Sequence, residues 1–100
     1  MSDEEGKTAG YQLPGATTLS HAAKLGLMED KPIMLDYWAG SLDKKVLIGV
    51  RENQEKLLVK SEDEYTSPIS KIFKVDESYI IMTENSIYLV SSSIPNKRIS

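Results

Sequence analysis

The chain has 100 residues, which is enough for one domain, and its 12 basic and 15 acidic residues give a net charge of −3 at pH 7. The basic residues are spread along the sequence, so no run of positive charge marks a nucleic-acid-binding tract. There is no cysteine, which excludes disulfide bonds, thiolate catalysis and zinc sites built on cysteine ligands.

The first residues are acidic and lack an apolar segment, and no run of about 18 apolar residues occurs in the chain. The sequence therefore predicts neither a signal peptide nor a membrane span. It favours a soluble, intracellular protein.

In chain order, residues 1–18 are rich in acids, glycine and proline and predict a flexible N-terminal tail. Residues 19–30 follow with apolar side chains at a spacing that suits one short helix, the alternative being a linker. Thr18 or Ser20 would cap this helix and Gly26 would end it.

Residues 31–94 alternate short apolar runs with polar breaks and predict a β-domain, followed by a C-terminal tail over 95–100. The first strand is predicted at Ile33–Ala39, after a proline that favours extended backbone. A hairpin over Val46–Lys60 is the clearest local pattern, because residues alternate regularly on both sides of a polar turn.

Three further strands are predicted at 69–75, 78–83 and 86–91, and two-residue turns join them into a meander. The last strand carries apolar side chains on both faces. Such a strand is typical of the centre of a sheet or of an interface.

Together these elements predict an all-β fold, a small antiparallel meander of five or six strands that forms a barrel or rolled sheet. A flexible N-terminal arm and at most one short helix would precede it. About 70 residues make a thin core, so a second subunit or another partner is expected to cover part of the apolar surface.

Catalytic and metal-binding patterns are lacking. His21 is the only histidine and has no acidic residue four positions away to share a metal ion. The acidic run Ser61–Glu64 has the spacing that an acidophilic kinase favours but lacks the geometry of a calcium loop, and a solvated loop is the simpler interpretation. The sequence predicts no catalytic residue, metal ligand or cofactor, and hence a non-enzymatic protein.

Aromatic side chains on strands are the candidates for partner binding, because they anchor protein interfaces and stack on bases. The predicted partner-binding residues are Tyr37, Trp38, Tyr79 and Tyr88. The alternative is a small barrel that binds nucleic acid through the basic residues of the 44–60 region, namely Lys44, Lys45, Arg51, Lys56 and Lys60. Against this alternative, the two strands of that hairpin contain no aromatic residue.

The stretch from Lys31 to Ile94, with EDEYTSPISKIF and IIMTENSIYLVSS as its most distinctive words, resembles small uncharacterised proteins encoded by large DNA viruses of algae and protists. The resemblance implies a viral origin and a role in the virion or in contact with the host. It implies no catalytic residue. The sequence as a whole favours a structural or protein-interaction module that self-associates or binds a protein partner.

Overall fold

In the computed structural model, which describes residues 13–99, helix α1 spans Ala16–Glu29 and begins directly after Gly15. Residues 16–18, predicted as part of a flexible tail, therefore form the first turn of the helix, while residues 1–12 lie outside the described residues. Thr18 does not cap the helix. Its side chain is buried, and its hydroxyl donates to the carbonyl of Val75 over 3.4 Å.

The end of α1 also differs from the prediction, because Gly26 lies inside the helix and not after it. The helix ends at Glu29, and Asp30 follows in the left-handed region with φ 55°. The carbonyl of Gly26 accepts the backbone N–H of Lys31 over 3.0 Å. A Cβ at position 26 would lie only 3.0 Å from the Lys31 carbonyl oxygen, so glycine permits this tight chain reversal.

Within the described part of the chain, eight short strands form two four-stranded sheets. The strands are β2 (Ile33–Met34), β3 (Leu47–Val50), β4 (Lys56–Ser61), β5 (Glu64–Tyr65), β6 (Ile69–Val75), β7 (Ser78–Thr83), β8 (Ile87–Ser91) and β9 (Asn96–Arg98). The first sheet has the order β2-β8-β7-β6, and the second sheet has the order β5-β4-β3-β9. Most neighbours are antiparallel, but β2 pairs with β8 and β3 pairs with β9 in parallel.

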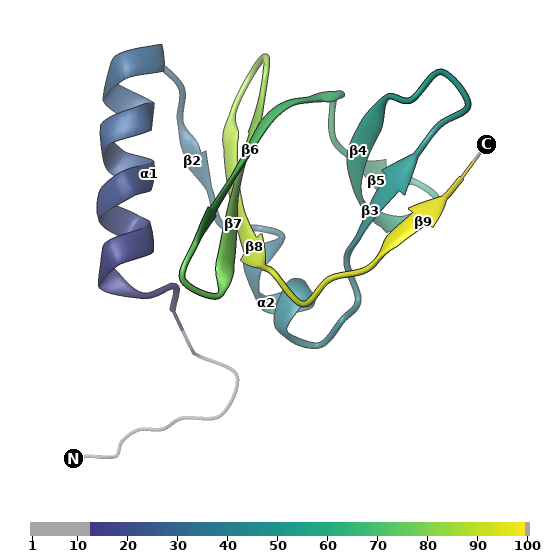
Figure 1. The fold of residues 1–100 in the computed structure, drawn as a ribbon, viewed down its shortest axis with the longest axis horizontal. Helices are drawn as coiled ribbons and strands as arrows, with labels where there is room; N and C mark the ends of the chain where they lie inside the picture. Colours follow the sequence, from purple (N-terminus) through teal and green to yellow (C-terminus); the bar gives the residue numbers. More distant parts are fainter. Residues whose placement is uncertain (1–12, 100) are drawn as a thin grey trace.

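The molecule has three layers, with α1 on one face of the first sheet and the second sheet on the other (Figure 1). The prediction that strands dominate is confirmed. A short helix before the strands was also predicted, and α1 is that helix, although it starts earlier than predicted. The predictions of a closed barrel and of a purely antiparallel meander are wrong, because the strands form two mixed sheets.

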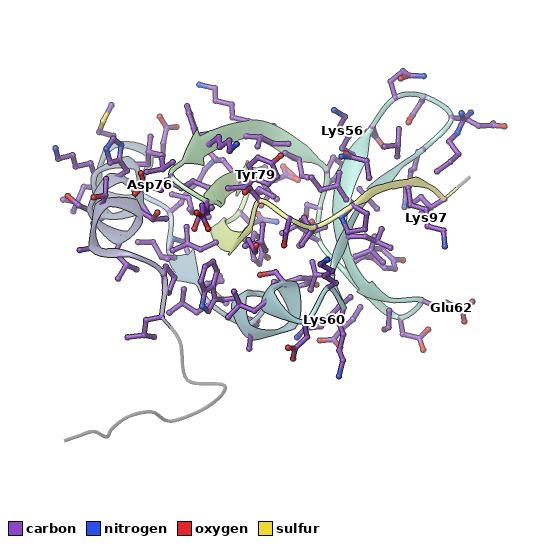
Figure 2. The ribbon with its side chains drawn as sticks, turned by 60° about the horizontal axis from the view of Figure 1, so that its bottom comes forward. Lys56, Lys60, Glu62, Asp76, Tyr79 and Lys97 are labelled. Carbon is purple, nitrogen blue, oxygen red and sulfur yellow. The ribbon has the colours of Figure 1, made fainter. Side chains whose placement is uncertain are left out.

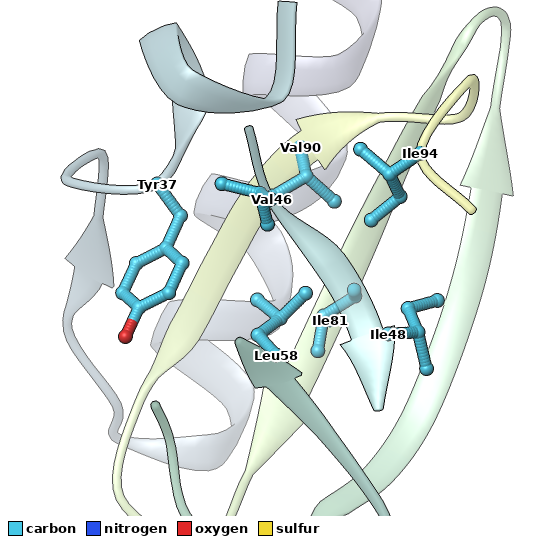
Figure 3. Packing of buried hydrophobic residues seen from close by; sticks show 7 residues of the cluster. All are labelled: Tyr37, Val46, Ile48, Leu58, Ile81, Val90 and Ile94. Carbon is cyan, nitrogen blue, oxygen red and sulfur yellow. The ribbon is translucent and has the colours of Figure 1, made fainter. Parts of the chain in front are cut away.

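The core between the two sheets gathers buried side chains from both (Figure 3). It consists of Tyr37, Val46, Ile48, Leu58, Ile81, Val90 and Ile94. The core between α1 and the first sheet consists of Ala22, Trp38, Ile80, Met82, Ile87 and Leu89. Strand β8 contributes to both cores, as expected for the strand predicted to carry apolar residues on both faces. Strand β7 contributes to both cores as well.

The strand predicted at Ile33–Ala39 stops after Met34, and a short helix α2 (Trp38–Leu42) follows a turn. The buried Ser41 holds α2 in place, because its hydroxyl donates to the Trp38 carbonyl over 2.6 Å and accepts the Ser91 backbone N–H over 2.8 Å. Tertiary contacts of this kind outweigh the apolar alternation that suggested a strand.

The C-terminal segment also differs from the prediction of a tail over 95–100. Residues 96–98, predicted as part of a tail, form β9 and pair in parallel with Ile48, Gly49 and Val50. The hairpin between β3 and β4 is as predicted, with Leu47 opposite Val59 and Val50 opposite Lys56. The Asp76–Glu77 turn also forms a hairpin, and Asp76 takes a positive φ of 54° there.

Candidate functional site: the outer face of the second sheet

The second sheet buries one face against the first sheet, and no element within residues 13–99 forms a layer over its other face. Both helices pack on the first sheet, α1 against β2, β7 and β8, and α2 against β8. We call the exposed side of β5-β4-β3-β9 the outer face. It forms an open groove of about 700 Å³ lined by Leu47, Arg51, Leu57, Val59, Ser61, Glu62, Tyr65, Lys97 and Ile99.

Strand alternation places these side chains on one face. In β3, Ile48 points into the core between the sheets, so Leu47 and Arg51 point outward. In β4, Leu58 points inward, and Leu57 and Val59 therefore point outward. For the first strand of the hairpin, the sequence alternation predicts Val46, Ile48 and Val50 inward and Leu47, Gly49 and Arg51 outward. In the structure Val46 and Ile48 lie in the core, and Leu47 and Arg51 line the groove.

The floor of the groove is closely packed around Gly49. A Cβ at this position would lie 2.7 Å from Cδ1 of Ile99 and 3.0 Å from Cγ2 of Val59, so only glycine lets Ile99 lie across β3. Leu57 is only 1% exposed although it belongs to the outer face. The side chains around Leu57 therefore pack closely over it, and the accessible apolar surface of the groove comes from its less buried lining residues, including Tyr65 and Ile99.

Two large apolar side chains stand at the rim of this floor. Tyr65 is 53% exposed and lies beside Val59 in the register of β4 and β5. Ile99 is 40% exposed. A tyrosine that is half in contact with an apolar floor and half in water is a typical anchor of a protein interface.

Charged groups flank the groove at separate places. Arg51 follows β3 and forms an ion pair of 3.9 Å with Glu55, each side chain being 42% exposed. Lys97 lies on the neighbouring strand β9, where it pairs with Gly49 of β3. Glu62 lies at the other end of the face, in the turn between β4 and β5 (Figure 2).

The four aromatic residues predicted to bind a partner are not on this face. Tyr37 and Trp38 are 6% and 8% exposed and belong to the two different cores. Tyr79 and Tyr88 are partly buried against the core between the sheets, where the Tyr37 and Tyr88 rings meet edge to face with centroids 5.3 Å apart. These aromatic side chains pack the interior.

The exposed aromatic residue of the candidate site is Tyr65, which directly follows the acidic run Ser61–Glu64 that the sequence predicts to be a solvated loop. The loop is acidic, but Glu64 and Tyr65 pair with β4 as a short edge strand. A signal was present in the sequence, because Ser61 and Asp63 are turn-forming residues, and the Asp63 backbone N–H donates to the Ser61 hydroxyl over 3.2 Å in the turn that brings Tyr65 back beside β4.

The basic residues of the nucleic-acid alternative lie at different places. Lys44 and Lys45 precede β3, whereas Arg51 and Lys56 lie at the opposite end of the hairpin. The Lys60 ammonium lies 4.9 Å from the centroid of the Tyr37 ring and 3.6 Å from a Glu64 carboxylate oxygen. Figure 2 places Lys56 and Lys60 at opposite ends of β4. The nucleic-acid alternative stays a prediction without a shared basic surface to support it.

Tyr37 is the titratable group that the fold perturbs most clearly. Burial, together with the charges of Tyr88, Glu64 and Asp36, raises the pKa of Tyr37 to about 12. Its hydroxyl therefore keeps its proton throughout the physiological range. The group stabilises the core as a neutral phenol and is a poor candidate for a general base.

A smaller hollow of about 330 Å³ lies between α1 and β6, with His21, Lys24 and Lys74 among its lining residues. Within residues 13–99, no three His, Cys, Asp or Glu side chains come together in a way that would hold a metal ion. No helix in this range is long and apolar enough to cross a membrane.

Comparison with known proteins returned no matching protein family, no matching curated protein and no matching solved structure. The function must therefore be argued from the geometry of the outer face.

Proposed function

We propose that this chain is a non-enzymatic protein-interaction module and that the outer face of the second sheet is its binding surface. The observation that carries the proposal is the groove on this face, bordered by the half-exposed Tyr65 and Ile99, which neither helix covers. Exposed tyrosine and aliphatic side chains beside a groove are typical of protein-binding sites.

The composition of the face also fits protein binding better than small-molecule catalysis. Its centre is aliphatic, its anchor is a tyrosine, and its charged groups stand at the rim, which is the usual anatomy of a protein interface. A catalytic site would instead bring polar groups together in a concave pocket. The resemblance to viral proteins adds a setting to the proposal, either assembly of a virion or contact with host proteins.

A site-specific photo-crosslinker tests this function. A photoreactive phenylalanine analogue replaces Tyr65 on the outer face or, in a control variant, Leu27 on α1, which is 86% exposed but lies on the opposite side of the molecule (Figure 1). Both variants are irradiated as pure protein and in an extract of the cells in which the chain is naturally made. We expect one discrete adduct from position 65 and none from position 27.

The added substitution Val59→Lys serves as the specificity control, because it places a charge on the apolar floor without altering the core between the sheets. The adduct at position 65 should then disappear. Equal labelling from positions 65 and 27, or an adduct that survives Val59→Lys, would show that the outer face is not the binding surface.

A further inference from the structure

The outer face carries opposite charges at opposite corners. Lys97 lies on β9 opposite Gly49, and Arg51 comes directly after the last residue of β3. Glu55 forms an ion pair with Arg51, so Lys97 supplies the net positive charge of this basic corner. Glu62 follows the last residue of β4, beyond Val59, which is opposite the first residue of β3. Figure 2 shows Lys97 and Glu62 on the same side of the second sheet. The acidic corner is therefore diagonal to the basic corner.

Such a face is complementary to itself. In a twofold dimer the same patch meets itself, and each residue i that contacts residue j is matched by a second contact between j and i. A twofold axis that lies in the plane of the face, perpendicular to the line between the corners, brings the basic corner of each copy onto the acidic corner of the other. The apolar floors then meet at the axis.

From this arrangement we propose that the outer face binds a second copy of this chain, with Lys97 of each copy facing Glu62 of the other across the dimer axis. The proposal rests on the proposed function, because it names the occupant of the same face. Both salt-bridging contacts form only in this antiparallel orientation. If the second copy were instead placed with each corner against the same corner of its partner, like charges would meet, and this repulsion disfavours that orientation.

The hollow between α1 and β6 lacks this property. Two of its lining residues, Lys24 and Lys74, are cations, and no carboxylate lines it. Two copies of that surface would repel one another. Charge complementarity therefore favours the outer face over this hollow as the contact between copies.

The interface is small, with nine lining residues on each copy, compared with roughly 20–30 residues a side in stable complexes. We therefore expect a weak dimer in rapid exchange. Its opposed charges lie at the rim and are screened by salt, so added salt should weaken the association.

Sedimentation velocity tests the proposal at chain concentrations between about 10 µM and about 1 mM, the range in which so small an interface would dimerise. The variants are Glu62→Lys and Lys97→Glu. Each places like charges together at both contacts, and we expect the dimer dissociation constant to rise by about 10-fold or more for Glu62→Lys and less for Lys97→Glu, which leaves Arg51 in place.

An equimolar mixture of the two variants is the decisive sample. In the mixed dimer one contact joins the two substituted residues with reversed charges, and the other contact keeps the original Lys97 and Glu62. Association should return to within about 3-fold of the original protein. Glu29→Lys on α1 is the matched control, since it makes the same change of charge at an exposed position away from the outer face, and it should leave association unchanged.

Three outcomes would overturn the proposal. They are an original chain that stays monomeric at every concentration, a mixture that associates no better than either variant alone, and a control variant that weakens association as strongly as Glu62→Lys. A monomeric chain whose position 65 still cross-links to a different protein in cell extract would reject the second copy as occupant and support the interaction module. If the chain neither dimerises nor cross-links to another protein from position 65, the dimer and the interaction module are both rejected.

Discussion

Tyr37 makes the stability of the protein sensitive to alkaline pH. Its pKa is about 12 in the fold against 10.0 for an unperturbed tyrosine, so between these values the folded chain keeps a proton that the unfolded chain has lost. The folded state then binds more protons, and the free energy of unfolding falls as pH rises. This stabilising contribution is complete below pH 10 and would be lost by pH 12, to the extent of about 3 kcal/mol at most.

Urea unfolding at a series of pH values between 8 and 12 measures this effect. The variant Tyr37→Phe is the control, because it keeps the ring against Tyr88 and removes the ionisable hydroxyl. We expect the free energy of unfolding to fall less steeply with pH in the variant. Identical pH profiles for the two proteins would contradict the assignment of the raised pKa to Tyr37.

Helix α1 is held to the first sheet by a close contact that only a small side chain allows. Ala22 is fully buried in the core that contains Ile80 and Leu89, whereas its neighbour Ala23 is exposed. We expect Ala22→Leu to lower the free energy of unfolding by about 1–3 kcal/mol, because the added carbons push the helix away from the sheet.

Ala23→Leu makes the same chemical change one position away and has the same effect on helix propensity. It should change stability by less than about 0.5 kcal/mol. Urea denaturation of both variants, followed by the fluorescence of Trp38 in the same core, makes the comparison. Equal destabilisation by the two substitutions would mean that α1 is not packed through Ala22.

The elements that could be predicted from the sequence are those made of neighbouring residues. The β3–β4 hairpin and the chain of β6, β7 and β8 follow from alternating apolar residues and short turns, and both are present. The parallel pairs could not be predicted in this way, because β2 and β9 join strands that lie about 50 residues away in sequence. The prediction of a strand at Ile33–Ala39 was wrong for a similar reason. The conformation of this segment depends on the buried Ser41, whose hydroxyl accepts a hydrogen bond from the distant Ser91 backbone N–H.

The candidate site could be predicted only in part. Alternation in the hairpin placed Leu47 and Arg51 on the face opposite Ile48, and the structure agrees. The sequence favoured Tyr37 and Trp38 as binding residues because exposed and buried aromatic residues look alike in a strand pattern, yet both are buried. Ile99 lies at the site because β9 pairs in parallel with β3, and no local sequence pattern predicts this pairing.

At the scale of the whole molecule, the first sheet lies between the two cores and belongs to both. On β7, Ile80 and Met82 face α1 while Ile81 faces the second sheet, so each core rests on the same backbone. Loss of either core exposes one side of this strand and weakens the other core. The three layers should therefore unfold in one cooperative transition.

Two matched core substitutions test this coupling. Leu89→Ala removes a fully buried leucine from the core beside α1, and Leu58→Ala removes one from the core between the sheets. Each should cost about 2–5 kcal/mol, because it leaves a cavity in a packed interior. In both variants, urea midpoints from Trp38 fluorescence, which reports on the core beside α1, and from far-ultraviolet circular dichroism, which reports on the whole backbone, should shift together. If Leu58→Ala shifted the dichroism midpoint and left the fluorescence midpoint unchanged, the second sheet would unfold as an independent unit, and its outer face would then need a bound partner to stay in place.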